Sequence, residues 1–302
     1  MTIKEAAVQL RAVLSSYYEP REASAISDMV LEDLTGYSRV DRIIHDQQEL
    51  SAGQLSGLSV AMKYLQLKMP VQYILGYTYF AGLRLKVNSQ VLIPRPETEE
   101  LVEWIRQTYN GASEVNIPET DKGSISILDI GTGSGCIPLA LKQCFAEGKI
   151  YGGDISDGAL GVARHNSRLT GLDVAFFKMD ALDDSAAQVE SLCQRLGPLD
   201  CIVSNPPYID LADMAEMEPH VLDYEPHLAL FPEKSLSATI FYEKIAILAS
   251  KLLKPGGFLF FEINPLYVKE TLDLLKKAGG DLIEIRRDLQ GKDRMVKCLF
   301  KS

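Results

Sequence analysis

The chain has 302 residues and a formal net charge of −10, from 31 basic and 41 acidic side chains. Its composition, 46% hydrophobic and 24% charged, is that of a globular protein and excludes a disordered or fibrous chain. The net negative charge argues against a protein that binds nucleic-acid phosphates over a large surface, because such binding needs a basic face. At about 150 residues per domain, the length predicts two domains.

Neither the cysteines nor the histidines form a metal-binding pattern. The chain has 5 cysteines without a CxxC pair and 4 histidines without ligand spacing, so we expect reduced thiols, no disulfide framework and no metal. The N-terminus has no apolar signal core, and the longest strongly apolar run, Phe258 to Phe261, is too short to cross a bilayer. We therefore expect a cytoplasmic protein that does not bind membranes.

The first part of the chain, residues 1–75, predicts a small helical domain. Thr2 and Glu5 fit a capping box, and apolar residues follow them at helical spacing. Pro20 fits the start of a second helix and Gly36 its end. No strand pattern occurs in this part of the sequence.

Short strand patterns begin after the helical part. Residues 77–80 and 83–87 have β-type sequences joined by Ala81 and Gly82, which predicts a hairpin. We expect this hairpin to connect the two domains, as a linker over residues 76–92.

From residue 93 onward, strand and helix patterns alternate, which predicts a mostly parallel sheet covered on both faces. A polar loop is expected over 110–124, and the α/β domain is expected to cover 93–302. The expected strands cover residues 125–130, 150–154, 174–178, 199–204 and 258–263, followed by a terminal hairpin of 282–287 and 295–300.

A glycine-rich turn, Asp129-Ile-Gly-Thr-Gly-Ser-Gly135, follows the first of these strands and opens a helix. Glycines let a ligand approach the backbone closely, and we expect them to offer free N–H groups. A dinucleotide fingerprint would need a glycine at Cys136, so the spacing favours S-adenosylmethionine. An ordinary strand-to-helix turn is the alternative. The candidate cofactor-binding residues in this turn are Asp129, Gly131, Thr132, Gly133, Ser134 and Gly135.

Asp154 ends the second expected strand, and Asp180 lies just past the third. Asp154 lies about 20 residues after the glycine turn, where doubly wound folds hold a ribose hydroxyl. A helix N-cap is the alternative reading of Asp154. Asp180, with Ala181 beside it, is a fainter candidate for binding the adenine amine, and it is equally consistent with a turn residue.

The sharpest motif is Asn205-Pro-Pro-Tyr208, directly after the fourth strand. The two prolines, Pro206 and Pro207, have no N–H, so the loop offers carbonyl acceptors. With the Asn205 side-chain oxygen, these acceptors can hold both hydrogens of an –NH2 group, and the Tyr208 ring can lie against the attached planar group. A rigid proline turn is the weaker alternative, because the loop lies where open α/β sheets bind ligands. We expect these four residues to bind the substrate and catalyse the reaction.

With these motifs, the chain resembles the HemK/PrmC family of peptide chain release factor glutamine N5-methyltransferases over nearly its full length. The Asn-Pro-Pro-Tyr motif is shared with adenine and guanine amino-methyltransferases, whereas the Pro-Arg-Pro-Glu-Thr-Glu block is more discriminating. The matching blocks, in order, are Tyr73–Phe80, Leu92–Glu99, Asp129–Cys136, Asn205–Ile209, Tyr224–Phe231 and Gly291–Met295.

The resemblance implies a Rossmann-like S-adenosylmethionine-dependent methyltransferase sheet, with an N-terminal helical domain that helps hold a release factor. It implies methyl transfer from S-adenosylmethionine to the N5 side-chain amide of the glutamine in a Gly-Gly-Gln motif, leaving S-adenosylhomocysteine. By the same resemblance, Asn205 and the Pro206 carbonyl hold the glutamine amide, with Tyr208 beside it. Arg95 and Glu97 lie near the pocket mouth. We expect a monomer that does not bind nucleic acid directly.

Two positions depart from the family pattern. Some relatives have an aromatic residue at the position of Ala181, beside the adenine. In this chain we expect another part of the sequence to supply the side chain that packs against the adenine ring. Asn264 stands where a glycine is common, and we expect neither departure to affect the chemistry of the Asn-Pro-Pro-Tyr motif.

Two other functions remain as alternatives. A nucleic-acid amino-methyltransferase, acting on adenine N6 or guanine N2, would need a basic recognition surface, but residues 1–75 hold 7 basic and 9 acidic side chains. A non-catalytic S-adenosylmethionine-binding protein would not need the intact Asn205–Tyr208 motif.

Overall fold

The computed structural model describes residues 1–110, 125–210, 219–232 and 237–301, so the polar loop predicted over 110–124 lies almost wholly outside the described residues. The described chain forms two compact units. The first comprises Met1–Tyr77 together with helix α10 (Pro219–Tyr224), and the second comprises the rest from Thr78 onward. Within the described ranges, no helix has the length and apolarity needed to span a membrane.

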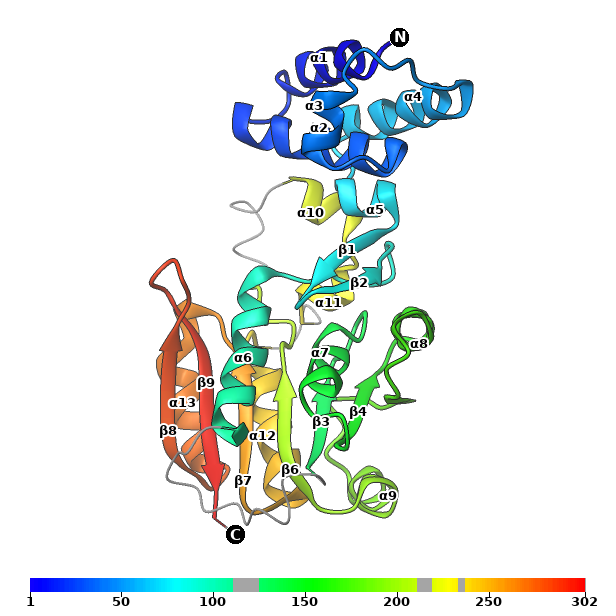
Figure 1. The fold of residues 1–302 in the computed structure, drawn as a ribbon. Coiled ribbons are helices and arrows are strands. Elements are labelled where there is room, and N and C mark those ends of the chain that lie inside the picture. The colour runs from blue at the N-terminus through cyan, green and yellow to red at the C-terminus, as the bar shows by residue number, and fades with distance from the viewer. Residues whose placement is uncertain (111–124, 211–218, 233–236, 302) are drawn as a thin grey trace. The chain divides into compact units, whose positions relative to one another are not determined.

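The first unit is helical, as predicted (Figure 1). The predicted capping box of Thr2 and Glu5 is present, and the second helix begins at Pro20 and ends before Gly36, whose φ is 69°. Buried aliphatic side chains such as Leu10 and Val30 form its core. The helices are α1 (Ile3–Leu14), α2 (Pro20–Thr35), α3 (Arg39–Ile44), α4 (Ala52–Gln66) and α5 (Val71–Leu75).

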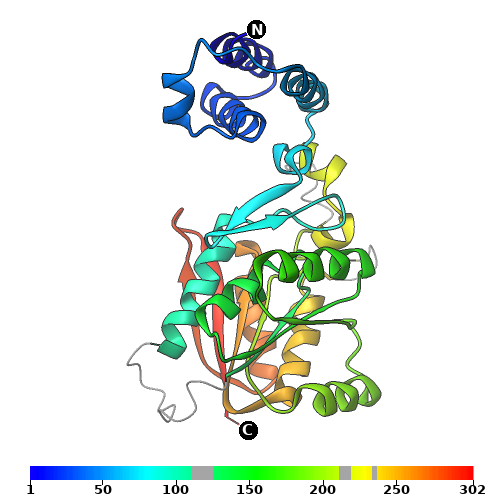
Figure 2. The ribbon, with the colours of Figure 1, turned by 45° about the vertical axis from the view of Figure 1, so that its right-hand side comes forward.

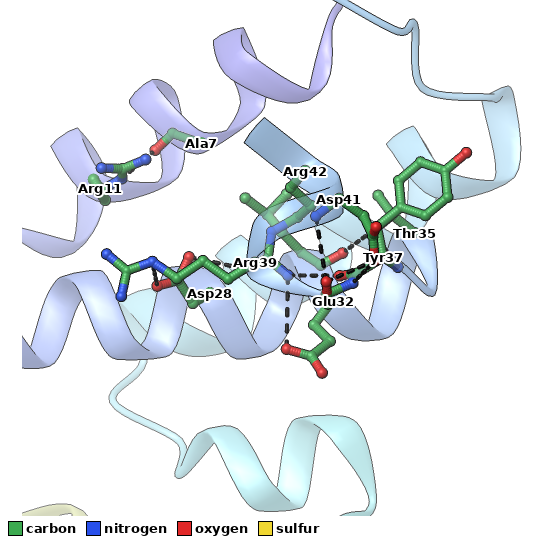
Figure 3. A network of polar contacts seen from close by, with 11 residues as sticks. Ala7, Arg11, Asp28, Glu32, Thr35, Tyr37, Arg39, Asp41 and Arg42 are labelled. Carbon is green, nitrogen blue, oxygen red and sulfur yellow. Dashed lines mark hydrogen bonds and ion pairs between the residues drawn. The ribbon is translucent and has the colours of Figure 1, made fainter. Parts of the chain in front are cut away.

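The buried Arg42 side chain attaches the short helix α3 to α2 (Figure 3). Its guanidinium forms a 2.8 Å ion pair with Asp28 Oδ1 and donates to the Tyr37 carbonyl at 2.8 Å. Glu32 lies 3.7 Å away on the same helix as Asp28. A buried guanidinium needs such partners because an unpaired buried charge is strongly destabilising.

We expect Arg42→Ala to lower the free energy of unfolding of the helical unit by about 2 kcal/mol, because Asp28 and the Tyr37 carbonyl lose their shared donor. Urea unfolding of the full chain, followed by circular dichroism, measures this effect. Arg39→Ala is the matched control: Arg39 is 77% exposed and lies 3.8 Å from Asp28, so its loss should cost less than about 0.5 kcal/mol. Equal losses for the two variants would contradict the anchoring role of Arg42.

A segment from far along the chain belongs to the first unit. The Tyr224 hydroxyl, at the end of α10, donates to the Leu67 carbonyl at 2.7 Å. Sequence patterns did not predict this connection, because a six-residue helix has too little periodicity to detect.

The second unit is built on a seven-stranded sheet of order β5-β4-β3-β6-β7-β9-β8. Strands β3 to β7 run parallel, and the predicted terminal hairpin of β8 and β9 adds two antiparallel strands. The alternating strand pattern is thereby confirmed. The strands are β3 (Ser126–Ile130), β4 (Lys149–Asp154), β5 (Ala175–Lys178), β6 (Leu199–Ser204), β7 (Leu253–Glu262), β8 (Gly280–Arg287) and β9 (Asp293–Phe300).

Helices cover both faces of the sheet, as predicted, because consecutive strand residues point to opposite sides. Ile127 belongs to a core cluster that includes residues of α6, α7 and α8, whereas Leu128 belongs to one that includes residues of α9, α12 and α13. Figure 2 shows the teal and green helices α6 to α8 on one side and the yellow to orange helices on the other. The helices are α6 (Pro96–Asn110), α7 (Cys136–Cys144), α8 (Asp157–Thr170), α9 (Ala186–Leu196), α11 (His227–Leu230), α12 (Ile240–Leu252) and α13 (Val268–Lys277).

The predicted hairpin is present as β1 (Tyr77–Phe80) and β2 (Leu83–Lys86), with the turn at Ala81 and Gly82. From Thr78 onward it belongs to the second unit. The buried Asn166 side chain of α8 accepts from the Lys86 N–H at 2.7 Å and donates to the Lys86 and Ser134 carbonyls. Asn166 therefore ties the hairpin to the glycine turn.

Candidate active site

A cavity of about 400 Å³ lies at the carboxyl ends of β3, β4, β5 and β6, a volume that suits a small-molecule ligand. β3 and β6 are neighbours, although β4 and β5 come between them in the sequence. Open α/β sheets bind ligands at such a switch in strand order. The predicted site residues that line the cavity are Gly131, Gly133, Asp154, Asp180, Ala181, Asn205 and Pro207.

N–H groups of the glycine turn donate hydrogen bonds to acceptors at the end of β4. The N–H groups of Gly131 and Thr132 donate to the Gly153 carbonyl at 2.9 and 3.0 Å, and that of Gly133 donates to Asp154 Oδ2 at 2.8 Å. The expectation that this turn offers free N–H groups is therefore wrong for these residues. The turn is folded against the end of β4, and this arrangement fixes its shape.

The turn provides space for a ligand. Gly131 and Gly133 have φ values of 76° and 54°, and a Cβ added at either residue would meet nothing within 4 Å. Both residues line the cavity, so the bare backbone there leaves room for a ligand to approach. Gly135 differs, because an added Cβ would lie 3.0 Å from the Phe176 ring. Gly135 permits close packing of α7 on the sheet.

The polar side chains of the turn lie buried beneath it. The carboxyl oxygens of Asp129 and the hydroxyls of Thr132 and Ser134 have no hydrogen-bond partner among the described residues. Burial raises the pKa of Asp129 to about 7. Buried polar groups are normally satisfied, so this cluster beside a cavity fits a ligand or water that supplies polar partners.

We expect the Asp129 carboxyl to make the ligand-free protein less stable as pH rises. Because its folded-state pKa of about 7 exceeds its ordinary value of 3.8, the folded chain retains a proton that the unfolded chain releases. Between pH 5 and pH 8, the free energy of unfolding should fall by about 2.5 kcal/mol more in the wild type than in Asp129→Asn. Urea midpoints at both pH values measure the difference, and identical pH dependence would contradict this role of Asp129.

Asp154, the last residue of β4, and Asp180, in the loop after β5, both line the cavity but have different partners. Besides holding the Gly133 N–H, Asp154 accepts from the Ser156 N–H at 2.9 Å. A carboxylate has about four acceptor positions, so Asp154 can still accept from a ligand hydroxyl. The Asp180 carboxylate accepts from the Leu182 N–H at 2.9 Å, which is the geometry of a turn residue.

The Asn205–Tyr208 loop begins where β6 ends beside β3. The Ser204 hydroxyl donates to the Ile130 carbonyl at 2.6 Å, which fixes the two strand ends together. Asn205 and Pro207 line the cavity. Pro206 is buried, and the Tyr208 hydroxyl points away to a carboxylate, donating to Glu262 Oε1 at 3.0 Å.

Asn264 contacts the backbone of this loop. Its Nδ2 donates to the Tyr208 carbonyl at 3.1 Å, while its Oδ1 accepts from the Leu266 N–H at 3.0 Å. A glycine at this position would have no side chain to make either bond. The departure from the family pattern thus supplies a second attachment for the loop.

A buried carboxylate, Glu225, joins two of the blocks that resemble the family, Leu92–Glu99 and Tyr224–Phe231. Glu225 Oε1 forms a 2.6 Å ion pair with Arg95, and Glu225 Oε2 accepts from the Ile93 N–H at 3.1 Å. Glu97 accepts instead from the Gln290 side chain at 3.2 Å. Arg95 and Glu97 are not among the residues that line the cavity.

Comparison with known proteins identifies the family. The release factor glutamine methyltransferase of Flavobacterium psychrophilum is 38% identical over 301 residues, which cover 100% of both chains. The chain belongs to the release factor glutamine methyltransferase family. The family member of that name from Bacteroides thetaiotaomicron is 36% identical, and the match covers 95% of this chain and 96% of the relative. The resemblance inferred from the motifs is confirmed.

Domain and structure comparisons agree with this family membership. Residues 5–76 match the PrmC N-terminal domain, and residues 121–279 match a methyltransferase domain. A crystal structure of the hMettl16 catalytic domain with the MAT2A 3′UTR hairpin 6 has a TM-score of 0.53 at 13% identity. That match covers 83% of this chain and 82% of the other, and it confirms the predicted methyltransferase fold.

Several residues that line the cavity were not predicted from the sequence motifs. Ser89–Leu92 precede the discriminating proline block and form one wall. Two aromatic residues, Phe231 and Phe241, also line the cavity. Phe231 lies in the block Tyr224–Phe231, which matches the family in sequence. That match did not predict a place at the cavity, because the fold brings Phe231 there.

Proposed function

We propose that this family member transfers a methyl group from S-adenosylmethionine to the side-chain amide nitrogen of the glutamine in the Gly-Gly-Gln motif of a release factor. The observation that carries the proposal is the Asn205-Pro-Pro-Tyr208 loop at the cavity, in a chain similar over its full length to release factor glutamine methyltransferases. We further propose that the helical unit helps hold the release factor and that the enzyme acts as a cytoplasmic monomer.

The residues at the cavity fit S-adenosylmethionine, which supplies a sulfonium-bound methyl group when present. Gly131 and Gly133 leave room beside the backbone, and the Asp154 carboxylate can accept from ribose hydroxyls. Phe231 and Phe241 are the aromatic candidates for the adenine wall that Ala181 does not supply. The buried polar cluster under the turn provides partners for the amino-acid portion of the cofactor.

The Asn205 loop holds the glutamine amide. Asn205 Oδ1 and the Pro206 carbonyl accept its two hydrogens, since a proline pair offers acceptors and no N–H between them. An amide nitrogen is a poor nucleophile because its lone pair is delocalised. Fixed acceptors direct that lone pair toward the methyl group and stabilise the positive charge that develops on nitrogen. The methylated nitrogen is acidic and loses one proton to solvent, so a dedicated general base is not required.

Incubation with methyl-labelled S-adenosylmethionine tests the proposed substrate. Release factor, DNA and RNA are offered separately, together with a release factor whose Gly-Gly-Gln glutamine is replaced by alanine. We expect label in the unaltered release factor alone. Label in nucleic acid and none in release factor would instead establish the amino-methyltransferase alternative.

A further inference from the structure

Two buried side chains behind Asn205 have no role in the predicted site. Thr98 lies on α6, in the block Leu92–Glu99, and Glu262 ends β7; each is 2% exposed. The Thr98 hydroxyl donates to Glu262 Oε2 at 2.7 Å. Asn205 Nδ2 donates to Thr98 Oγ1 at 3.3 Å. A continuous chain of hydrogen bonds thus runs from a buried carboxylate to the amide at the cavity.

The donor and the acceptor of each hydrogen bond in this series follow from the chemistry of the side chains. A carboxylate only accepts, so the single hydroxyl hydrogen of Thr98 is committed to Glu262. Thr98 Oγ1 then faces Asn205 as an acceptor, and the Asn205 atom that meets it must be the –NH2 nitrogen. Because an amide is planar, Oδ1 is the atom left for the cavity.

The same carboxylate holds the other end of the loop. The Tyr208 hydroxyl donates to Glu262 Oε1 at 3.0 Å, so the two carboxylate oxygens receive one hydroxyl donor each. Two hydroxyl donors complement an ionised carboxylate, since a protonated one would leave one hydroxyl without its acceptor. Arg294 provides positive charge nearby, which favours the ionised form against the burial that raises the pKa of Glu262.

We propose that Thr98 and Glu262 are positioning residues that fix the orientation of the Asn205 amide, so that its oxygen and not its nitrogen meets the substrate –NH2. The proposal rests on the proposed function, because only an amino-group substrate needs an acceptor at this point. A flipped Asn205 would present its own hydrogens to the hydrogens of the glutamine amide, which prevents binding in the reactive orientation.

Three substitutions in the full-length enzyme test this orientation. Thr98→Val keeps the side-chain shape and removes the hydroxyl, whereas Thr98→Ser retains it. Glu262→Gln adds an –NH2 group that can donate to Thr98 and thereby turn the hydroxyl hydrogen toward Asn205. Thr108→Val is the matched control, because Thr108 is also buried on α6 and its hydroxyl donates only to the Trp104 carbonyl.

We expect Thr98→Val and Glu262→Gln to lower kcat for release-factor methylation by about 10- to 100-fold, with the Kd for S-adenosylmethionine within about threefold of wild type. Thr98→Ser and Thr108→Val should keep kcat within about threefold. The thermal transition shows whether Thr98→Val and Glu262→Gln are folded. A folded variant of either kind that retains wild-type kcat would overturn the proposal. An equal loss in Thr98→Ser also overturns it. A wild-type enzyme that does not methylate the release factor would refute the proposed function. This outcome differs from those that refute only the positioning roles of Thr98 and Glu262.

Discussion

Replacing Asn205 with alanine is expected to lower kcat for methylation of a release factor by about 100- to 1,000-fold. The substitution removes the side-chain oxygen that accepts from the glutamine amide, and it leaves the two prolines in place. Asn205 lines the same cavity as the glycine turn, but most of that wall comes from other residues. The Kd for S-adenosylmethionine should therefore change by less than about fivefold.

Two measurements make the Asn205→Ala result decisive. Equilibrium binding of S-adenosylmethionine separates loss of catalysis from loss of the cofactor site. Asn110→Ala, at the exposed end of α6, serves as a control for the loss of an amide and should retain full activity. An Asn205→Ala variant with wild-type kcat would show that the loop does not hold the substrate amide.

The second large effect is expected at Asp154. Its carboxylate accepts from the N–H groups of Gly133 and Ser156 and lines the cavity. Asp154→Ala removes the acceptor proposed for the ribose and also releases the glycine turn from the end of β4. Hydrogen bonds to a charged group contribute about 1.5–3 kcal/mol each. We therefore expect the Kd for S-adenosylmethionine to rise about 100-fold.

Asp157 offers a matched comparison for Asp154. It follows the same strand, but its side chain is 76% exposed and pairs with Lys178. Asp157→Ala should leave the Kd within about twofold of wild type. If Asp154→Ala bound the cofactor as tightly as this control, the assignment of Asp154 to the ribose would have to be withdrawn.

Local sequence signals were sufficient for much of the fold. A capping box, a proline start and a glycine stop predicted helices α1 and α2, and alternating patterns predicted the strands of the second unit, whereas the short helices α3 and α5 were not predicted. The parallel sheet also followed from the alternation of strands and helices, because parallel strands require crossover connections. These features depend on neighbouring residues, and a single sequence contains them directly.

Long-range contacts were the part that the sequence could not reveal. Glu225 is 130 positions from Arg95, and Glu262 is 164 positions from Thr98, yet each carboxylate bonds to that distant residue. The glycine turn was predicted to donate N–H groups, but the close approach of β4 uses them. In each case the missing information was which distant segments of the chain meet in the fold.

Mass spectrometry of a release factor after reaction with the enzyme and S-adenosylmethionine tests the proposed activity directly. The peptide that contains the Gly-Gly-Gln motif should gain the mass of one methyl group, with fragmentation placing it on the glutamine side chain. The gain should be absent with Asn205→Ala. An unmodified Gly-Gly-Gln peptide in the presence of active wild-type enzyme, or a methyl group on any other residue, would contradict the account.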